Sequence, residues 1–327
     1  MSNDNLTFLE NKPTIKHVSI LGIPIDIGKD NVGTDQGPEH LRKHGLLEML
    51  SAIRVTHADL GDVNCPTRES AHVGDKKVKY LKEIVEVSRR VASTVEREVG
   101  EKHLLIALGG DHSLSLGTFA GALAATKGDL GIIYIDAHGD IHTDDTSPSG
   151  NIHGMMVAAA LGEGHEELVQ LFSKKLKPEN FIYVGLKDLE QGEIDLIRKK
   201  KLSTETIIDL ADHGLSQTFA KIKGLQSRVK SIWVSLDLDS IDQEYAPATP
   251  IINTGGLTYR EITSLAKFIG KTCNLVGFDI VELQPSRDKE EKTTKLAIEL
   301  IATLLGAEYN WYTSYMAHEE EKQAARK

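Results

Sequence analysis

The sequence has very little cysteine and no long hydrophobic run. Its 327 residues include two cysteines, Cys65 and Cys273, which form no C-x-x-C pair and no disulfide framework. We therefore expect two reduced thiols in a reducing compartment. The opening segment MSNDNLTFLENKPT lacks the apolar core of a secretion signal, and no stretch approaches the roughly 20 apolar residues that span a bilayer. The sequence therefore predicts a cytoplasmic protein that does not use a membrane.

Positive charge is scarce relative to negative charge. Lysine and arginine number 38 against 48 aspartate and glutamate residues, which gives a net charge of −10. An acidic surface repels phosphate groups, so we expect neither nucleic acid nor an anionic membrane as the main partner. Apolar residues make up 40% and charged residues 26%, the proportions of an ordinary folded protein. Composition alone leaves the substrate open.

No linker, low-complexity segment or internal repeat divides the chain. Short apolar runs alternate with amphipathic segments instead: the run 103–108 is bounded by Gly109-Gly110, and residues 75–98 have the spacing of a long helix. This alternation predicts an α/β protein with a single-domain open parallel sheet and helices on both faces, in three layers. The expected parts are a flexible arm over 1–14, the α/β domain over 15–316 and a charged tail over 317–327.

Two local patterns predict elements near the ends of the sheet. A helix is expected to begin at Gly37-Pro38, because proline is tolerated in a first turn, and to continue through the leucines up to Leu50. A short strand is expected over 206–208, followed by a helix near 215–223.

Metal-type side chains follow the apolar run 132–135. Asp136, His138, Asp140 and His142 occur at every second position. Side chains along an extended strand alternate faces, so all four point the same way if the extended geometry persists. Taken alone, the segment is equally well explained as a solvated turn.

Similar residues follow three further predicted strands. The strands lie over 103–108, 231–236 and 275–281, and the residues that follow them include His112, Asp237, Asp239 and Glu282. In a parallel sheet the carboxyl ends of the strands meet at one edge, so these side chains are predicted to converge there. The Gly109-Gly110 pair lacks the spacing and the lysine of a phosphate-binding P-loop, which excludes that interpretation.

The predicted cluster is rich in carboxylates. Its members are His112, Asp136, His138, Asp140, Asp237 and Asp239. One divalent ion rarely needs four carboxylates, whereas two ions about 3.5–4 Å apart can share them. Oxygen and imidazole ligands without thiolate favour manganese over zinc or copper. We therefore predict two Mn²⁺ ions per subunit, with a bridging water that ionises to a hydroxide nucleophile near neutral pH.

Five short segments resemble the ureohydrolase family, which comprises arginases, agmatinases and their relatives. They are GGDHS (109–113), DAHGD (136–140), SPSGNIHG (147–154), SLDLDSID (235–242) and GFDIVEL (277–283). Similarity to arginases extends over most of the chain and includes GTDQGPEHLRKHGLL (33–47) and GGLTYREI (255–262). The resemblance implies an open α/β sheet, a Mn(II) pair, hydrolysis of a guanidinium to urea and an amine, and assembly as a homo-oligomer, a trimer or hexamer.

The resemblance also implies roles for individual residues. The six predicted ligands are those of the family, and Asp140 would in addition hold the bridging hydroxide by a hydrogen bond. His153 would shuttle a proton to the leaving amine; the alternative is a loop histidine that caps the helix 155–162, but the spacing from Ser149 and Asn151 favours the functional role. Glu282 would form a salt bridge with the guanidinium. A carboxylate that fixes the cation and an imidazole that protonates the departing nitrogen suit this chemistry.

The implied substrate contacts include two departures from the usual arginase pattern. Ser149 and Asn151 would bind an α-carboxylate, and Glu190 would bind an α-amino group. His142 and Thr249 are the substrate contacts at the two positions where the sequence departs from the pattern. Arginases commonly have asparagine where His142 stands. The segment PATPI (247–251) lacks the family's Gly-Thr pair, so the polar group of that pair is either absent or supplied by Thr249.

These observations predict hydrolysis of L-arginine to L-ornithine and urea. One alternative is the same chemistry on agmatine, a guanidino acid or formiminoglutamate. A second is a single-zinc deacetylase on a related fold, but Asp136 and His112 together favour two ions. A third is a catalytically silent ligand sensor, which has little reason to keep a complete set of ligands.

Overall fold

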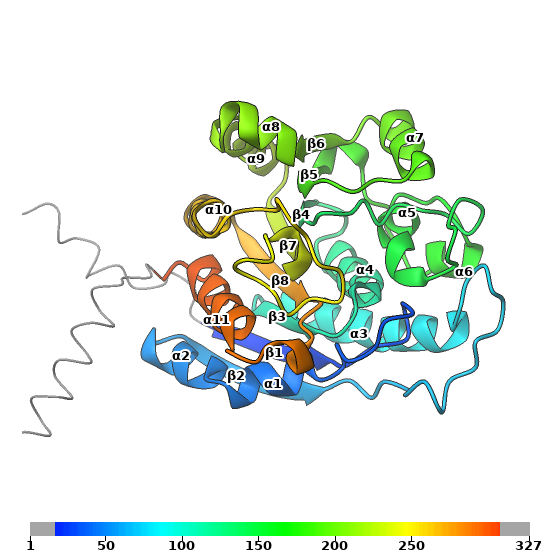
Figure 1. The fold of residues 1–327 in the computed structure, drawn as a ribbon, viewed down its shortest axis with the longest axis horizontal. Helices are drawn as coiled ribbons and strands as arrows, with labels where there is room; N and C mark the ends of the chain where they lie inside the picture. The colour runs from blue at the N-terminus through cyan, green and yellow to red at the C-terminus, as the bar shows by residue number, and fades with distance from the viewer. Residues whose placement is uncertain (1–16, 308–327) are drawn as a thin grey trace, which may run out of the picture.

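A computed structural model describes residues 17–307, in which one eight-stranded sheet lies between two layers of helices (Figure 1). The strand order is β2-β1-β3-β8-β7-β4-β5-β6, and every neighbouring pair is parallel. The predicted three-layer α/β fold is confirmed. The predicted arm over 1–14 and tail over 317–327 lie outside the described residues.

The strands in the middle of the sheet are buried, except at the first residue of β7 and the first two residues of β8. The strands are β1 (His17–Ile23), β2 (Thr56–Asp62), β3 (Leu104–Gly109), β4 (Leu130–Ile135), β5 (Phe181–Leu186), β6 (Ser203–Thr206), β7 (Ser231–Asp237) and β8 (Leu275–Val281). Along β4, Ile132 and Tyr134 pack into one hydrophobic cluster, while Ile133 and Ile135 pack into the other. A strand with apolar neighbours on both faces needs a continuous apolar run, which is why the sequence shows no alternation there.

Each face of the sheet is covered by its own set of helices. The helices over the first cluster are α3 (Leu81–Gly100), α4 (Ser115–Ala125), α5 (Met156–Ala160), α6 (Glu166–Val169) and α7 (Gln191–Lys200). Those over the second are α1 (Gly37–Lys43), α2 (Leu46–Ala52), α8 (Ile207–His213), α9 (Ser216–Arg228), α10 (Tyr259–Thr272) and α11 (Lys292–Leu304). No helix within the described part of the chain is both long and apolar enough to cross a membrane.

Two sequence-based boundaries are wrong, and each has a local cause. The helix that begins at Gly37 is interrupted at Gly45, which has a φ of 103° and separates α1 from α2. The strand predicted over 206–208 lies earlier in the chain, as β6 over Ser203–Thr206, and α8 begins at Ile207. Thr206 accepts a hydrogen bond from the Asp209 amide and donates its own amide to the Asp209 carboxylate, and this capping box overrides the strand preference of two adjacent isoleucines.

Gly110 is a position where the backbone of two segments packs too closely for a side chain. A Cβ atom added to Gly110 would overlap the carbonyl oxygen of Ile25, which belongs to the loop after β1. We expect Gly110→Ala to lower the free energy of unfolding by about 3 kcal/mol, because backbone on both sides must shift. Urea denaturation followed by circular dichroism measures this change.

The matched control for that substitution is Gly100→Ala. A Cβ atom at Gly100 meets nothing within 4 Å, and the residue closes α3. This variant should be neutral or slightly more stable than the original chain, since alanine reduces the freedom of the unfolded state. Equal stabilities for the two variants would contradict the packing argument.

Candidate metal centre

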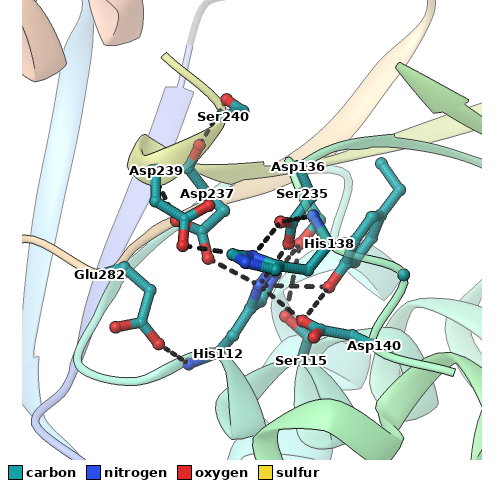
Figure 2. A network of polar contacts seen from close by, with 12 residues as sticks. His112, Ser115, Asp136, His138, Asp140, Ser235, Asp237, Asp239, Ser240 and Glu282 are labelled. Carbon is teal, nitrogen blue, oxygen red and sulfur yellow. Dashed lines mark hydrogen bonds and ion pairs between the residues drawn. The ribbon is translucent and has the colours of Figure 1, made fainter. Parts of the chain in front are cut away.

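Four adjacent strands bring the predicted ligands to one edge of the sheet. The strands β3, β8, β7 and β4 are neighbours, and the chain turns at the carboxyl end of each. The residues that follow or end these strands are His112, Asp136, His138, Asp140, Asp237, Asp239 and Glu282. Figure 2 shows the imidazoles and carboxylates of the first six pointing toward one another, with Glu282 beside them.

The first group of side chains is centred on His112. Its Nδ1 lies 3.1 Å from Asp136 Oδ2, 3.3 Å from Asp140 Oδ2 and 3.2 Å from Asp237 Oδ2. All four side chains are buried. Burial acts to lower the pKa of His112, but the three carboxylates that face its Nδ1 raise it well above its ordinary value. The group therefore needs a positive charge at this point, which either a proton or a cation can supply.

The second group shares Asp136 with the first. Nδ1 of His138 lies 3.4 Å from Asp136 Oδ1 and 3.4 Å from Asp239 Oδ2. In each of two sets of three residues, the ligand atoms lie within 4.8 Å of one another. The sets are His112, Asp136 and Asp140, and Asp136, His138 and Asp239. Two overlapping groups with one common carboxylate have the arrangement of a two-ion site.

The distances and the unpaired oxygens fit octahedral divalent ions. Ligand atoms about 2.1–2.3 Å from such an ion lie roughly 3.0–3.3 Å from one another, close to the separations around His112. Asp136 Oδ2 and Asp239 Oδ1 are buried and accept no hydrogen bond from any described residue. A buried carboxylate oxygen without a donor is costly, and a bound cation removes that cost.

A chain of hydrogen bonds beneath the cluster orients His112. Trp233 Nε1 donates to Asp279 at 2.6 Å and Thr118 donates to the same oxygen at 2.9 Å. Ser235 donates its hydroxyl proton to the other Asp279 oxygen and lies 2.9 Å from Nε2 of His112. Since Ser235 donates to Asp279, it accepts from Nε2–H. The Nδ1 lone pair of neutral His112 then faces the carboxylates, as a metal ligand requires.

Tyr134, Ser235 and Asp279 are site residues that the sequence analysis missed. The hydroxyl of Tyr134 donates to Asp140 Oδ2 at 2.7 Å and lies 3.1 Å from Nδ1 of His112, whose ring it stacks against. All three lie inside buried strands, where a single sequence shows them only as core residues. The one available signal was that Ser235 and Asp279 fall within the segments 235–242 and 277–283.

The extended geometry that would point the side chains of residues 136, 138, 140 and 142 the same way does not persist beyond β4. Strand β4 ends at Ile135, and the Asp136 carboxylate accepts a hydrogen bond from the His138 amide at 2.7 Å, which forms a turn. Asp140 has a φ of 46°, in the left-handed region. His142 is separate from the cluster, with Nε2 2.9 Å from Glu190 Oε2.

Glu282 and His153 border a small inner cavity beside the cluster, of about 10 Å³. Glu282 has a φ of 68°, and its carboxylate accepts a hydrogen bond from the His112 amide at 2.9 Å. Burial raises the pKa of Glu282, while its ion pair with Lys29 acts in the opposite direction. Burial lowers the pKa of His153, whose amide donates to the Gly28 carbonyl at 3.0 Å.

A larger outer cavity of about 290 Å³ adjoins the inner one. The predicted substrate contacts that line it are His142, Ser149, Asn151 and Glu190. Asn151 is partly engaged, because its side-chain amide bonds Lys79 at 3.0 Å and Asp30 at 3.1 Å.

Thr249 is the predicted contact that lines neither the inner nor the outer cavity. It is buried, and its hydroxyl donates to the Ile251 carbonyl at 2.7 Å. The side chain of Ile251 borders both cavities, so this loop presents an apolar group to the site.

A third His/Glu group lies at the opposite, amino-terminal end of the strands. It consists of Glu98, Glu101 and His103. Glu98 already accepts hydrogen bonds from Ser19 at 2.6 Å and from Arg97 at 2.9 Å. Its carboxylate is satisfied by the protein, unlike those of the cluster, so we assign no metal there.

A parallel α/β sheet with clustered imidazoles and carboxylates at its carboxyl edge is the architecture of a metal-dependent hydrolase. The model of the arginase family matches residues 16–306. The chain is 38% identical to the arginase of Bacillus caldovelox over 89% of this chain and 99% of the relative, and 37% identical to the arginase of Bacillus subtilis over 89% and 98%. The solved structure of the Bacillus caldovelox arginase superposes with a TM-score of 0.86 at 36% identity, covering 90% of this chain and all of that one. The chain is therefore a ureohydrolase enzyme. It belongs to the arginase family.

Proposed function

We propose that the chain hydrolyses the guanidinium group of L-arginine to L-ornithine and urea. The relatives named arginase support the substrate. The observation that best supports metal-assisted hydrolysis is that two His/Asp groups share the carboxylate of Asp136. These groups lie beside Glu282 and His153 at one edge of the sheet.

The proposed cofactor is a pair of Mn²⁺ ions per subunit. The residues that would hold them are His112, Asp136, His138, Asp140, Asp237 and Asp239. Donors made up of carboxylate oxygen and imidazole nitrogen favour manganese. When bound, such ions lower the pKa of a water molecule and so supply a nucleophile at neutral pH.

The remaining proposed roles follow from position in the two cavities. The Tyr134 hydroxyl bonds the Asp140 carboxylate, which would accept a hydrogen bond from the attacking water. Glu282 offers a carboxylate to the planar guanidinium, and bidentate pairing would orient that group. His153, in the wall of the inner cavity, donates a proton to the departing nitrogen.

The outer cavity is the proposed site for the amino-acid part of the substrate. Ser149 and Asn151 are proposed to contact the α-carboxylate, with Glu190 and His142 near the α-amino group. We leave Thr249 out, because its hydroxyl is already bonded within its own loop.

Substrate choice is tested with manganese-loaded protein and a panel of substrates. Release of urea or formamide is measured from L-arginine, agmatine, guanidinobutyrate and formiminoglutamate, and metal content is measured on the same sample. Turnover of arginine above the others supports the proposal. Good turnover of another compound with none of arginine replaces the substrate, and one zinc per chain removes the two-ion site.

We also propose a cytoplasmic homo-oligomer, a trimer or hexamer, built from one domain over 15–316. Both cysteines are free, and burial raises the pKa of Cys65 to about 12 and that of Cys273 to about 11, so both stay as thiols. This state suits a reducing compartment. Light scattering coupled to size-exclusion chromatography measures the subunit number.

Ser235 allows a test of the hydrogen-bond chain beneath the cluster. Ser235→Ala breaks the link between Asp279 and His112, and we expect manganese affinity to fall by about 10–100-fold because the imidazole loses its fixed orientation. Titration calorimetry measures this. Ser227→Ala, at a residue of α9 whose hydroxyl donates to the Gly224 carbonyl, should leave the affinity unchanged. Equal affinities in both variants would contradict the role of Ser235.

A further inference from the structure

Lys29 places a buried ammonium group in the wall of the inner cavity. Its side chain is 5% exposed, and Nζ forms an ion pair with Glu282, whose side chain is also 5% exposed. A lysine is almost never fully buried without a partner. Here the partner is the carboxylate that was proposed above to face the guanidinium. The chain thus supplies its own cation to that position.

Hydrogen bonds to the backbone of Gly28 and Lys29 hold this loop against neighbouring segments. The Gly28 amide donates to Asp111 at 2.7 Å, and the Gly28 carbonyl accepts from the His153 amide at 3.0 Å. The Lys29 carbonyl accepts a hydrogen bond from the guanidinium of Arg68. The loop therefore holds the Cα of Lys29 in place and directs its side chain inward, so that the ammonium can leave Glu282 only by rotation of the side chain.

The inner cavity has no room for a guanidinium while the ion pair is formed. Its volume of about 10 Å³ suffices for roughly one water molecule. A planar guanidinium is several times larger than water. The adjoining outer cavity of about 290 Å³ can take the rest of an amino acid. Displacement of the Lys29 ammonium is therefore needed before a guanidinium can reach Glu282.

The charges in the inner cavity also indicate that Lys29 must be displaced before a guanidinium can pair with Glu282. Among the described residues that line the inner cavity, Glu282 is the one carboxylate that is not a proposed metal ligand. Lys29 neutralises it. A cationic substrate therefore meets no unpaired carboxylate beside the cluster. Its binding free energy from Glu282 is only the difference between its own ion pair with that carboxylate and the Lys29 ion pair that it replaces.

We propose that Lys29 is a specificity-determining residue that competes with the guanidinium of the substrate for Glu282. The inference rests on the proposed function, because it takes Glu282 as the guanidinium contact. The lysine sets how tightly a cationic head group binds, and it does so without touching the groups that would hold the ions. The consequence is weak binding of guanidinium compounds by the original chain.

Two substitutions should change guanidinium affinity in opposite directions. Lys29→Gln removes the internal cation, and we expect the KM for L-arginine to fall about tenfold or more with a smaller change in kcat. Lys29→Arg supplies a planar, bidentate competitor for the same carboxylate, and we expect the KM to rise several-fold. A lysine with a purely structural role would give weaker binding in both variants.

The Lys29→Arg variant also keeps the inference falsifiable if Lys29→Gln is too unstable to purify, since it leaves Glu282 paired. The matched control is Lys200→Gln, which removes a partly exposed lysine that pairs with Glu163; neither residue lines the inner or the outer cavity. Its KM should equal that of the original chain. In the double variant Lys29→Gln with Glu282→Gln, the gain in affinity should disappear, because the contested carboxylate is gone.

A binding measurement separates this inference from the proposed function. Millimolar guanidinium chloride is titrated into manganese-loaded protein by calorimetry, with no turnover required. Tighter binding to Lys29→Gln than to the original chain supports the inference, and equal or weaker binding overturns it. Absence of urea release from every substrate of the panel overturns the proposed function instead, whatever the calorimetry shows.

Discussion

Substitution of Asp136 by asparagine should leave the folded chain unable to hold either proposed ion, and urea release from L-arginine should fall by at least roughly three orders of magnitude. Asp136 is the carboxylate common to both His/Asp groups, with one oxygen near His112 and the other near His138. An amide has the same shape but no charge and only one acceptor oxygen. Both groups therefore lose a ligand at once.

The comparison with His138→Asn makes this prediction specific. His138 belongs to one group only, so that variant should retain about one ion per chain, whereas Asp136→Asn should retain none. Metal content is measured by atomic emission after gel filtration. Thermal melting with and without manganese gives a second measurement, since ligand binding to the native state raises the melting temperature.

The control for both variants is Asp145→Asn. The side chain of Asp145 is 82% exposed and pairs with Lys77 on the surface. Metal content, melting temperature and activity should all match those of the original chain. Two ions per chain in Asp136→Asn would show that the shared carboxylate does not organise the site.

Substitution of His153 by asparagine is expected to reduce kcat about 100–10,000-fold while both proposed ions stay bound. His153 borders the inner cavity together with Asp140 and Glu282, but it is absent from the two His/Asp groups. Its loss removes the proposed donor for the departing nitrogen and leaves the ligands in place. Asparagine keeps the backbone amide that bonds Gly28.

Steady-state kinetics and metal analysis on the same preparation test this expectation. A fall in kcat with little change in KM and an unchanged metal content agrees with proton donation. His72→Asn, at an exposed histidine on the loop before α3, serves as the control and should retain full activity. A decrease of less than tenfold in His153→Asn would assign the proton transfer to another group.

The polar residues that follow the strands could be predicted from the sequence, because the pattern that marks them involves only residues close together in the chain. A buried apolar run, a turn and a polar side chain occupy fewer than about ten residues, and the parallel sheet brings such turns together. Asp136 and Asp237 both end or follow strands of this kind. Similarity to arginases added the roles that spacing does not reveal.

The contacts made within the core and across the chain could not be predicted in the same way. Asp279 looks like any residue of a buried strand until Trp233 and Ser235 are seen to surround it. The ion pair of Lys29 with Glu282 joins residues 253 positions apart, and no local sequence pattern predicts it. Backbone conformation is similarly hidden, since the turn that redirects 136–142 depends on a hydrogen bond rather than on composition.

The positive φ angles of Asp140 and Glu282 affect how the site should be dissected by mutagenesis. Residues with a Cβ other than asparagine and aspartate seldom adopt this conformation, and alanine there costs roughly 1–2 kcal/mol relative to an unstrained backbone. Alanine scanning at these two positions would therefore mix the loss of a carboxylate with relaxation of the main chain. Asparagine at 140, and glycine as a companion to glutamine at 282, would separate chemistry from conformation.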